Sequence, residues 1–171
     1  MSTPFRIYLA GPEVFFPEPL KLAQERKQFL ATLGLEGIFP LDNEIAGDSP
    51  EEIARAIFAA NCDLLDSADA VLANMTPFRG PSTDVGTAWE IGYAHALKKP
   101  IVAYSDDLSP YHEKVHRHGW SHEPHHTHDR HGHEVENFGG ADNLMLTQCI
   151  LAMYPTFEEA AVFLAKSLRE S

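Results

Sequence analysis

The sequence contains few of the residues that would build a disulfide framework, a membrane span or a nucleic-acid surface. It has only two cysteines, Cys62 and Cys149, and neither lies in a CxxC pair, which excludes a disulfide scaffold and a thiolate zinc site. No stretch approaches the roughly 20 apolar residues of a membrane-spanning helix. Lysine and arginine total 13 against 25 acidic residues, so the net charge is −12. This charge opposes binding to a phosphate backbone and favours a small-molecule substrate.

The remaining composition is typical of one globular domain. Hydrophobic residues make up 44% of the 171 residues, which is enough for a core of ordinary size. The first four residues lack the basic and apolar regions of a secretory signal peptide. We therefore expect a single domain over residues 1–171, located in the cytoplasm, that binds neither membranes nor nucleic acid.

Short apolar runs alternate with helical periodicity along most of the chain. The expected strands are 5–11, 37–41, 68–74 and 101–104. The expected helices are 19–33, 49–67, a segment from Asp84 to the Lys98-Lys99-Pro100 stop, and 157–168. The segment that starts at Asn143 is expected to form a helix or to pass from helix to strand. This order predicts an α/β fold with a parallel sheet and helices on both faces.

The segment from Asp84 to Glu90 is the main candidate for chemistry. Asp84 occupies an N-cap position, and Gly86 leaves room for a ligand or another backbone. The positive end of the helix favours an ionised carboxylate nearby, which makes Glu90 a candidate nucleophile. Apolar neighbours on most sides predict that this helix is largely buried. An acidic cap with a glutamate paired in the core explains the same spacing equally well.

Other candidates lie at the ends of the expected strands. Residues that follow the carboxyl end of a strand in a parallel sheet face the ligand crevice. By this rule the candidates are Tyr8, Glu13, Phe15, Asp42 and Glu44. A tyrosine at position 8 can hydrogen-bond a carboxylate or simply pack in the core. Asp69 lies at the start of a strand, and its position alone favours a structural or turn role.

Residues 105–142 interrupt the alternation with nine histidines between His112 and His133. The stretch 112–122 matches the HExxHxxGxxH zinc-protease pattern, and Met153 even resembles the methionine of a Met-turn. Pro110 and the lack of any aliphatic residue but Val115 argue that nothing anchors the helix that this site requires. We expect a solvated, His-rich loop without a specific metal site. Adventitious metal binding and a response to mild acid stay open.

Four separated pieces of the chain resemble the nucleoside 2-deoxyribosyltransferase family. They are Ile7–Pro12, Phe39–Glu44, Phe78–Tyr93 and Asn143–Met145. The resemblance implies a flavodoxin-like (Rossmann-like) fold with a five-stranded parallel sheet. It also implies a salvage enzyme of nucleotide metabolism that exchanges the base of 2′-deoxynucleosides for a free nucleobase through a covalent sugar intermediate, without a cofactor.

The resemblance also implies roles for individual residues. Glu90 is similar to the nucleophile, Tyr8 to the tyrosine that orients it, and Asp84 and Asp69 to the acids near the departing base and the sugar. The implied substrate-binding residues are Gly11, Phe15, Asp42, Glu44, Gly86, Asn143 and Met145. Phe15 would stack on the base, and Glu44 replaces a glutamine that contacts the base in some members.

The family forms dimers and hexamers. The resemblance therefore implies a homo-oligomer in which Asn143 holds the 5′-hydroxyl in a neighbouring subunit's site. If a glutamate first displaces the base and the next base then displaces the glutamate from the face that the first base left, the configuration is retained.

Three other functions are weighed against base exchange. One is an N-glycosidase that hydrolyses deoxynucleoside 5′-monophosphates, although Asp84 would repel a phosphate. A second is a nucleotide sensor without catalysis, which would not require the Glu90, Asp84 and Tyr8 combination. The third is a zinc-dependent protein that uses the His-rich loop.

Overall fold

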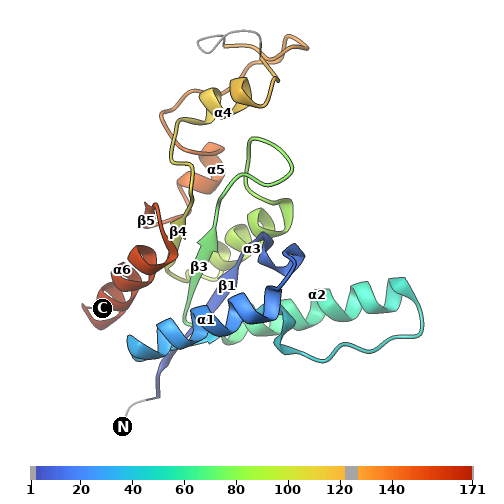
Figure 1. Ribbon diagram of the computed structural model, residues 1–171, viewed down its shortest axis with the longest axis vertical. Coiled ribbons are helices and arrows are strands. Elements are labelled where there is room, and N and C mark those ends of the chain that lie inside the picture. The colour runs from blue at the N-terminus through green and yellow to red at the C-terminus, as the bar shows by residue number, and fades with distance from the viewer. Residues whose placement is uncertain (1–2, 122–126, 171) are drawn as a thin grey trace.

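Five parallel strands form one sheet in the order β2-β1-β3-β4-β5. The computed structural model describes residues 3–121 and 127–170 (Figure 1). The strands are β1 (Phe5–Ala10), β2 (Leu35–Ile38), β3 (Ala70–Asn74), β4 (Ile101–Tyr104) and β5 (Ala152–Tyr154). All four neighbouring pairs are parallel, with Ile7 beside Ala70 and Val71 beside Ile101. The five-stranded parallel α/β fold is confirmed.

Helices cover both faces of this sheet. The α-helices are α1 (Pro19–Thr32), α2 (Pro50–Ser67), α3 (Val85–Ala96), α4 (Tyr111–Arg117), α5 (Leu144–Thr147) and α6 (Phe157–Glu170), with 3-10 turns η1 (Pro12–Phe15) and η2 (Pro40–Asp42). One half of the core packs α1 and α6 on the sheet, and the other half packs α2 and α3 on the opposite face. Figure 1 shows α4 and α5 beyond the carboxyl ends of the strands.

Local capping signals account for most helix starts. The Ser49 hydroxyl accepts a hydrogen bond from the Glu52 backbone N–H at 3.2 Å at the start of α2, and Thr156 does the same for α6. The expected strand 37–41 is wrong in its bounds, because the strand begins at Leu35 and a proline opens η2 at position 40. None of the helices within the described residues is both long and apolar enough to cross a bilayer.

Two expectations about helices are wrong. α3 is not largely buried, because Val85 is 85% exposed and Trp89 is 43% exposed. A helix, α4, does form in the His-rich segment, and it is anchored by Lys114 and Val115, both at most 3% exposed. The reason is tertiary: the long lysine stem packs as apolar surface, which the search for aliphatic residues overlooked.

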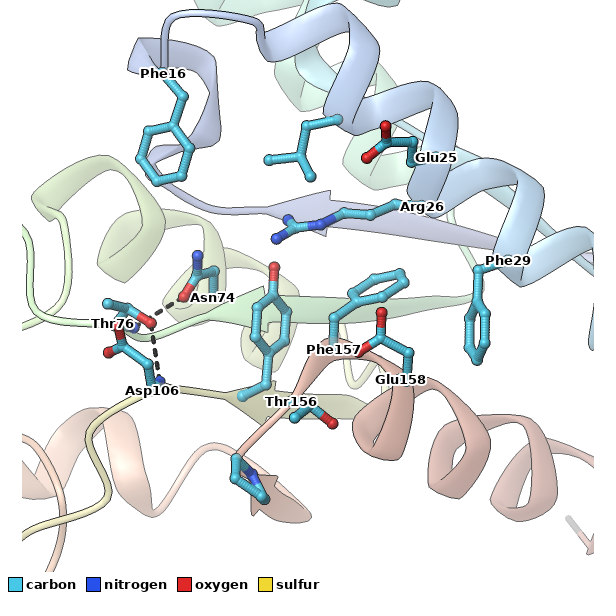
Figure 2. Close-up of a pocket in the computed structure, with 13 residues that line it drawn as sticks. Phe16, Glu25, Arg26, Phe29, Asn74, Thr76, Asp106, Thr156, Phe157 and Glu158 are labelled. Carbon is cyan, nitrogen blue, oxygen red and sulfur yellow. Dashed lines mark hydrogen bonds between the residues drawn. The ribbon is translucent and has the colours of Figure 1, made fainter.

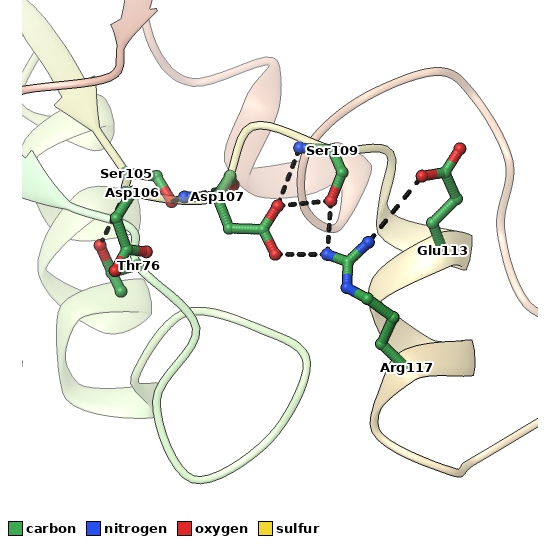
Figure 3. A network of polar contacts seen from close by, with 7 residues as sticks. All are labelled: Thr76, Ser105, Asp106, Asp107, Ser109, Glu113 and Arg117. Carbon is green, nitrogen blue, oxygen red and sulfur yellow. Dashed lines mark hydrogen bonds and ion pairs between the residues drawn. The ribbon is translucent and has the colours of Figure 1, made fainter.

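Polar contacts tie α4 to the end of β4. Figure 3 shows Arg117 on α4 directed toward Asp107 and Ser109, with Glu113 on its other side. The guanidinium donates to the Asp107 carboxylate and to the Ser109 hydroxyl. The described part of the His-rich segment is therefore a folded extension of the sheet's carboxyl edge.

Candidate active site

A tyrosine and a glutamate form a hydrogen-bonded pair on the face of the sheet that α2 and α3 cover. Tyr8 lies on β1 and is fully buried. Glu90 lies in the second turn of α3 and is half-buried. The Tyr8 hydroxyl donates a hydrogen bond of 2.6 Å to Oε1 of Glu90. The strand and the helix, 82 positions apart in sequence, thus place a carboxylate and its orienting donor in contact.

Burial is the main influence on the charge of this pair. It raises the pKa of Glu90 to about 7, while the hydrogen bond from Tyr8 acts in the opposite direction and the nearby Asp84 and Glu13 raise it further. Burial therefore outweighs the effect of the helix start on Glu90, since that effect fades within the first turn. Burial also raises the pKa of Tyr8, so this hydroxyl stays protonated and acts as a donor.

Asp84 caps α3 as its position predicts. Its Oδ2 accepts the backbone N–H groups of Gly86 at 3.0 Å and Thr87 at 3.2 Å. A Cβ on Gly86 would lie only 3.0 Å from that oxygen, so glycine gives the carboxylate its room. No hydrogen bond within residues 3–121 and 127–170 reaches Oδ1, which leaves one carboxylate oxygen available to a substrate.

Gly11, directly after β1, makes space for the buried carboxylate of Glu13. A Cβ at this position would lie 1.8 Å from Oε2 of Glu13. Glu13 is 1% exposed, and its Oε1 accepts from Arg26, from Asn74 at 2.6 Å and from Tyr104 at 2.8 Å. The sequence places Glu13 after a strand end, but it gives no sign of these three distant partners.

A cavity of about 490 Å³ lies near this cluster, on the α1–α6 side of the sheet. Figure 2 shows Arg26 among the rings of Phe16, Phe29 and Phe157 in its lining. Glu90 belongs to the opposite face, and it does not line this cavity. The cavity and the Tyr8–Glu90 pair are therefore separate features.

Two aromatic rings, one from η1 and one from the loop after β3, stack on each other. Phe15 is 55% exposed and stacks on Phe78, with ring centroids 5.7 Å apart and planes inclined by 12°. The Arg79 guanidinium lies over both rings, at 4.9 and 4.7 Å from their centroids. Stacking of Phe15 on a base stays a prediction.

Three predicted site residues are not brought to Glu90: Asp69, Asp42 and Glu44. Asp69 lies at the amino end of β3, is exposed, and accepts a 2.7 Å hydrogen bond from the Arg6 backbone N–H. Asp42 accepts from the Phe39 backbone N–H at 2.7 Å and pairs with Lys27. The prediction of a catalytic Asp69 is therefore corrected to a structural one, because its carboxylate is used at the opposite edge of the sheet.

Glu44 is exposed, on the segment that follows η2. Contact of Asp42 or Glu44 with a base stays a prediction.

Asn143 begins α5 and is held by its own chain. Its Oδ1 accepts from the Met145 backbone N–H at 3.0 Å, and its Nδ2 donates to Glu136 at 3.0 Å. Glu136 also accepts from the Leu144 backbone N–H at 2.6 Å. Met145 is 68% exposed, so this helix start presents its side chains outward, and Glu136 is a contact that the sequence did not indicate.

The zinc-protease pattern is only partly within the described residues. His112 and His116 lie one turn apart on α4, whereas His122 lies outside the described residues. Among residues 3–121 and 127–170, no three His, Cys, Asp or Glu side chains gather as a metal site would require. The described residues thus provide no zinc centre on which a protease mechanism could be built.

The fold and the site together define a class of protein: an α/β protein with a parallel sheet in which a buried tyrosine on β1 donates a hydrogen bond to a carboxylate on a capped helix. A sequence profile described as Nucleoside 2-deoxyribosyltransferase matches residues 7–145. The chain belongs to this family, and the resemblance drawn from its motifs is confirmed.

Individual relatives agree with this assignment. The structure of a 2-desoxiribosyltransferase from Leishmania mexicana is 32% identical with a TM-score of 0.77, and the match covers 95% of this chain and 98% of that one. A 2-deoxyribosyltransferase from Bacillus psychrosaccharolyticus, 23% identical over 91% of this chain and 90% of its own, has a TM-score of 0.57 and shares the fold.

A curated relative is also known from fission yeast. An uncharacterised protein of Schizosaccharomyces pombe is 35% identical over 116 residues, or 64% of this chain. The match spans 54% of that protein, about half of its length.

Proposed function

We propose that this protein is a nucleoside 2-deoxyribosyltransferase that moves a 2-deoxyribosyl group from one nucleobase to another. The observation that carries the proposal is the half-buried Glu90, which accepts a hydrogen bond of 2.6 Å from Tyr8 and lies near the capping carboxylate of Asp84. Family membership and the likeness to the Leishmania structure support the same reaction class. The substrates are 2′-deoxynucleosides and free bases, and the role is salvage.

In the first half-reaction, ionised Glu90 attacks the anomeric carbon of the deoxynucleoside. The bond from that carbon to the base nitrogen breaks, its electron pair goes to the base, and Asp84 delivers a proton to the departing base. The product is a deoxyribosyl ester on Glu90. Tyr8 donates to Glu90 and holds the attacking oxygen in place.

The second half-reaction reverses these steps with a different base. The incoming base nitrogen attacks the anomeric carbon, Asp84 takes up its proton, and the Glu90 carboxylate leaves. Two displacements at one carbon give net retention. Water in place of the base would release free deoxyribose, so the same intermediate also explains an N-glycosidase activity.

The proposal includes a second copy of the chain. An exposed apolar strip on α2 and α3 contains Ile57, Phe58, Val85 and Trp89, and Met145 is exposed on α5. Phe58 and Trp89 lie 5.2 Å apart between ring centroids. In the proposed oligomer this strip meets its counterpart, and Asn143 binds the 5′-hydroxyl in the neighbouring site.

The first experiment incubates the protein with deoxyinosine, alone and with adenine, and separates the products by chromatography. We expect deoxyadenosine in the presence of adenine, and no turnover by Glu90→Gln. Glu25→Gln, which changes an exposed glutamate of the cavity on the other face, is the matched control and should retain wild-type rates. Free hypoxanthine without exchange would reassign the protein as a hydrolase, and no turnover of any deoxynucleoside would refute the proposal.

A further inference from the structure

Asp142 is a buried carboxylate that joins two segments, one in the proposed site of its own chain and one that serves the site of the neighbouring chain. It is 2% exposed. Its Oδ2 accepts from the Thr83 backbone N–H and from the Thr83 hydroxyl, both at 2.7 Å. Its Oδ1 accepts from the Ser82 hydroxyl and, at 2.7 Å, from the Asn143 backbone N–H. Four donors thus converge on one side chain.

These donors stand next to two functional residues. Thr83 immediately precedes Asp84, and Asn143 immediately follows Asp142. We propose that Asp142 is a positioning residue that sets the location of the proton donor Asp84 and of the 5′-hydroxyl ligand Asn143 together. The inference rests on the proposed function, since it assigns Asp142 an effect only through those two residues.

Helix α4 of the His-rich segment lies against the turn that carries Asp142. Lys114 on α4 is 1% exposed. Burial lowers its pKa, and the neighbouring carboxylates of Asp107 and Asp142 act in the opposite direction. The Tyr111 backbone N–H at the start of α4 donates to the Gly140 carbonyl at 2.9 Å. A buried cation and a backbone hydrogen bond therefore hold the turn that carries Asp142.

An uncharged isostere cannot replace this carboxylate. Asparagine offers one acceptor oxygen, and its amide group, although the Ser82 or Thr83 hydroxyl can turn to accept from it, would face the backbone N–H of either Thr83 or Asn143. A buried donor left without an acceptor costs about 1–3 kcal/mol, so the contacts would separate. We expect Asp142→Asn to move Asp84 and Asn143 away from the substrate.

The choice of substrate separates positioning from general loss of structure. A nitrophenolate leaving group departs without protonation, so a nitrophenyl 2-deoxyriboside does not need Asp84. A substrate that also lacks its 5′-hydroxyl does not need Asn143. A displacement of about 1 Å can cost about 100-fold in rate, and each substrate removes one of the two sources of that loss.

The test compares kcat/KM of wild type and Asp142→Asn on deoxyinosine, nitrophenyl 2-deoxyriboside and its 5′-deoxy form. We expect a loss of about 100-fold on the first, a smaller loss on the second, and rates within about threefold on the third. Thr83→Val, which removes one hydroxyl donor and keeps the backbone N–H, should show the same order with smaller losses. If Asp142→Asn does not fold, this second variant decides the question.

Asp129→Asn is the matched control. Asp129 also lies in the His-rich segment and accepts several hydrogen bonds, from the His131 and His133 backbone N–H groups among others, but it makes no contact with residues 82–84. It should equal wild type on all three substrates. Equal losses on all three substrates, or no loss on deoxyinosine, would overturn the positioning role. Absence of turnover by wild type itself would instead refute the proposed function.

Discussion

Glu90 meets two requirements that oppose each other. Partial burial limits the access of water to the carboxyl, yet the form that attacks in the proposed mechanism is the ionised one, which burial disfavours. The result is a pKa of about 7, with the Tyr8 hydroxyl as the group that offsets part of the burial. At neutral pH the reactive fraction of Glu90 is therefore sensitive to small changes around it.

The first prediction concerns the pH dependence of sugar transfer to Glu90. Because ionised Glu90 is the proposed nucleophile, kcat/KM on nitrophenyl 2-deoxyriboside, whose leaving group needs no proton from Asp84, should rise with pH and level off above about pH 7. In Tyr8→Phe the lost hydrogen bond no longer favours the ionised form, so the rising limb should move to higher pH by about one unit. Initial rates from pH 5.5 to 9 for both proteins test this. A limb at the same pH in both would contradict it.

The second prediction concerns stability. The pKa of Glu90 is about 7 in the folded chain and near 4.5 as an ordinary value. Between these values the folded chain keeps a proton that the unfolded chain has released, so the free energy of unfolding falls as the pH rises. Glu90→Gln has no proton to release at this position, so its free energy of unfolding does not fall in this way. We expect it to be inactive but more stable than wild type at pH 8, by at most about 3 kcal/mol.

Urea unfolding at pH 4 and pH 8 measures this difference. At pH 4 the glutamate of the folded wild type and the glutamine of the variant are both uncharged, so the two proteins should have the same free energy of unfolding. Glu25→Gln should match wild type at both pH values, because that glutamate is exposed. A gain for Glu90→Gln that is the same at pH 4 and pH 8 would point to packing and not to charge.

At the scale of single elements, Asp84 caps a helix with the same carboxylate that acts in the proposed reaction. Asparagine is as good an N-cap as aspartate, but it cannot donate the catalytic proton as a carboxylic acid does. We therefore expect Asp84→Asn to keep the stability of wild type and to lose about 100-fold or more in exchange rate. Asp84→Ala should lose activity and, in addition, about 1 kcal/mol of stability. Thermal unfolding and exchange assays on both variants separate the roles, and equal destabilisation would contradict this division.

Elements with their own capping residues were predictable from the sequence. The bounds of α2 follow from Ser49 and Pro50, and those of α3 from Asp84. The helix α4 was missed because its anchor is a lysine, whose burial depends on acids that are distant or in other turns. This helix depends on tertiary contacts, which the local periodicity of the sequence does not indicate.

The site was predictable to a similar extent. The residues of the Tyr8–Glu90 hydrogen bond were both identified, one from a strand pattern and the other from a helix start. Asp142 and Glu136 were missed, because nothing in a polar stretch marks which carboxylate is buried. The prediction for Asp69 was wrong for a different reason. The family resemblance suggested a catalytic role, but the side chain accepts a hydrogen bond from the Arg6 backbone N–H.

At the scale of the whole molecule, the apolar strip on α2 and α3 leads to a prediction about assembly. Trp89→Glu places a charge where the proposed second copy packs, so it should lower the oligomer's mass in sedimentation and reduce exchange. Mixing the inactive variants Glu90→Gln and Asn143→Ala should restore part of the activity, because one hybrid site then has both residues intact. Wild-type activity of the Trp89 variant as a monomer would contradict action across subunits.

The order of the strands also has a consequence for how the chain folds. β5 pairs with β4, although the whole His-rich segment and α5 lie between Tyr104 and Ala152 in sequence. Among the connections between strands that follow one another in the chain, the one from β4 to β5 is the longest, so closing it costs the most entropy. We therefore expect β1, β2, β3 and β4 to assemble first and β5 with α6 to dock last, so that during refolding the protection of β5 amides from hydrogen exchange should lag behind that of β1.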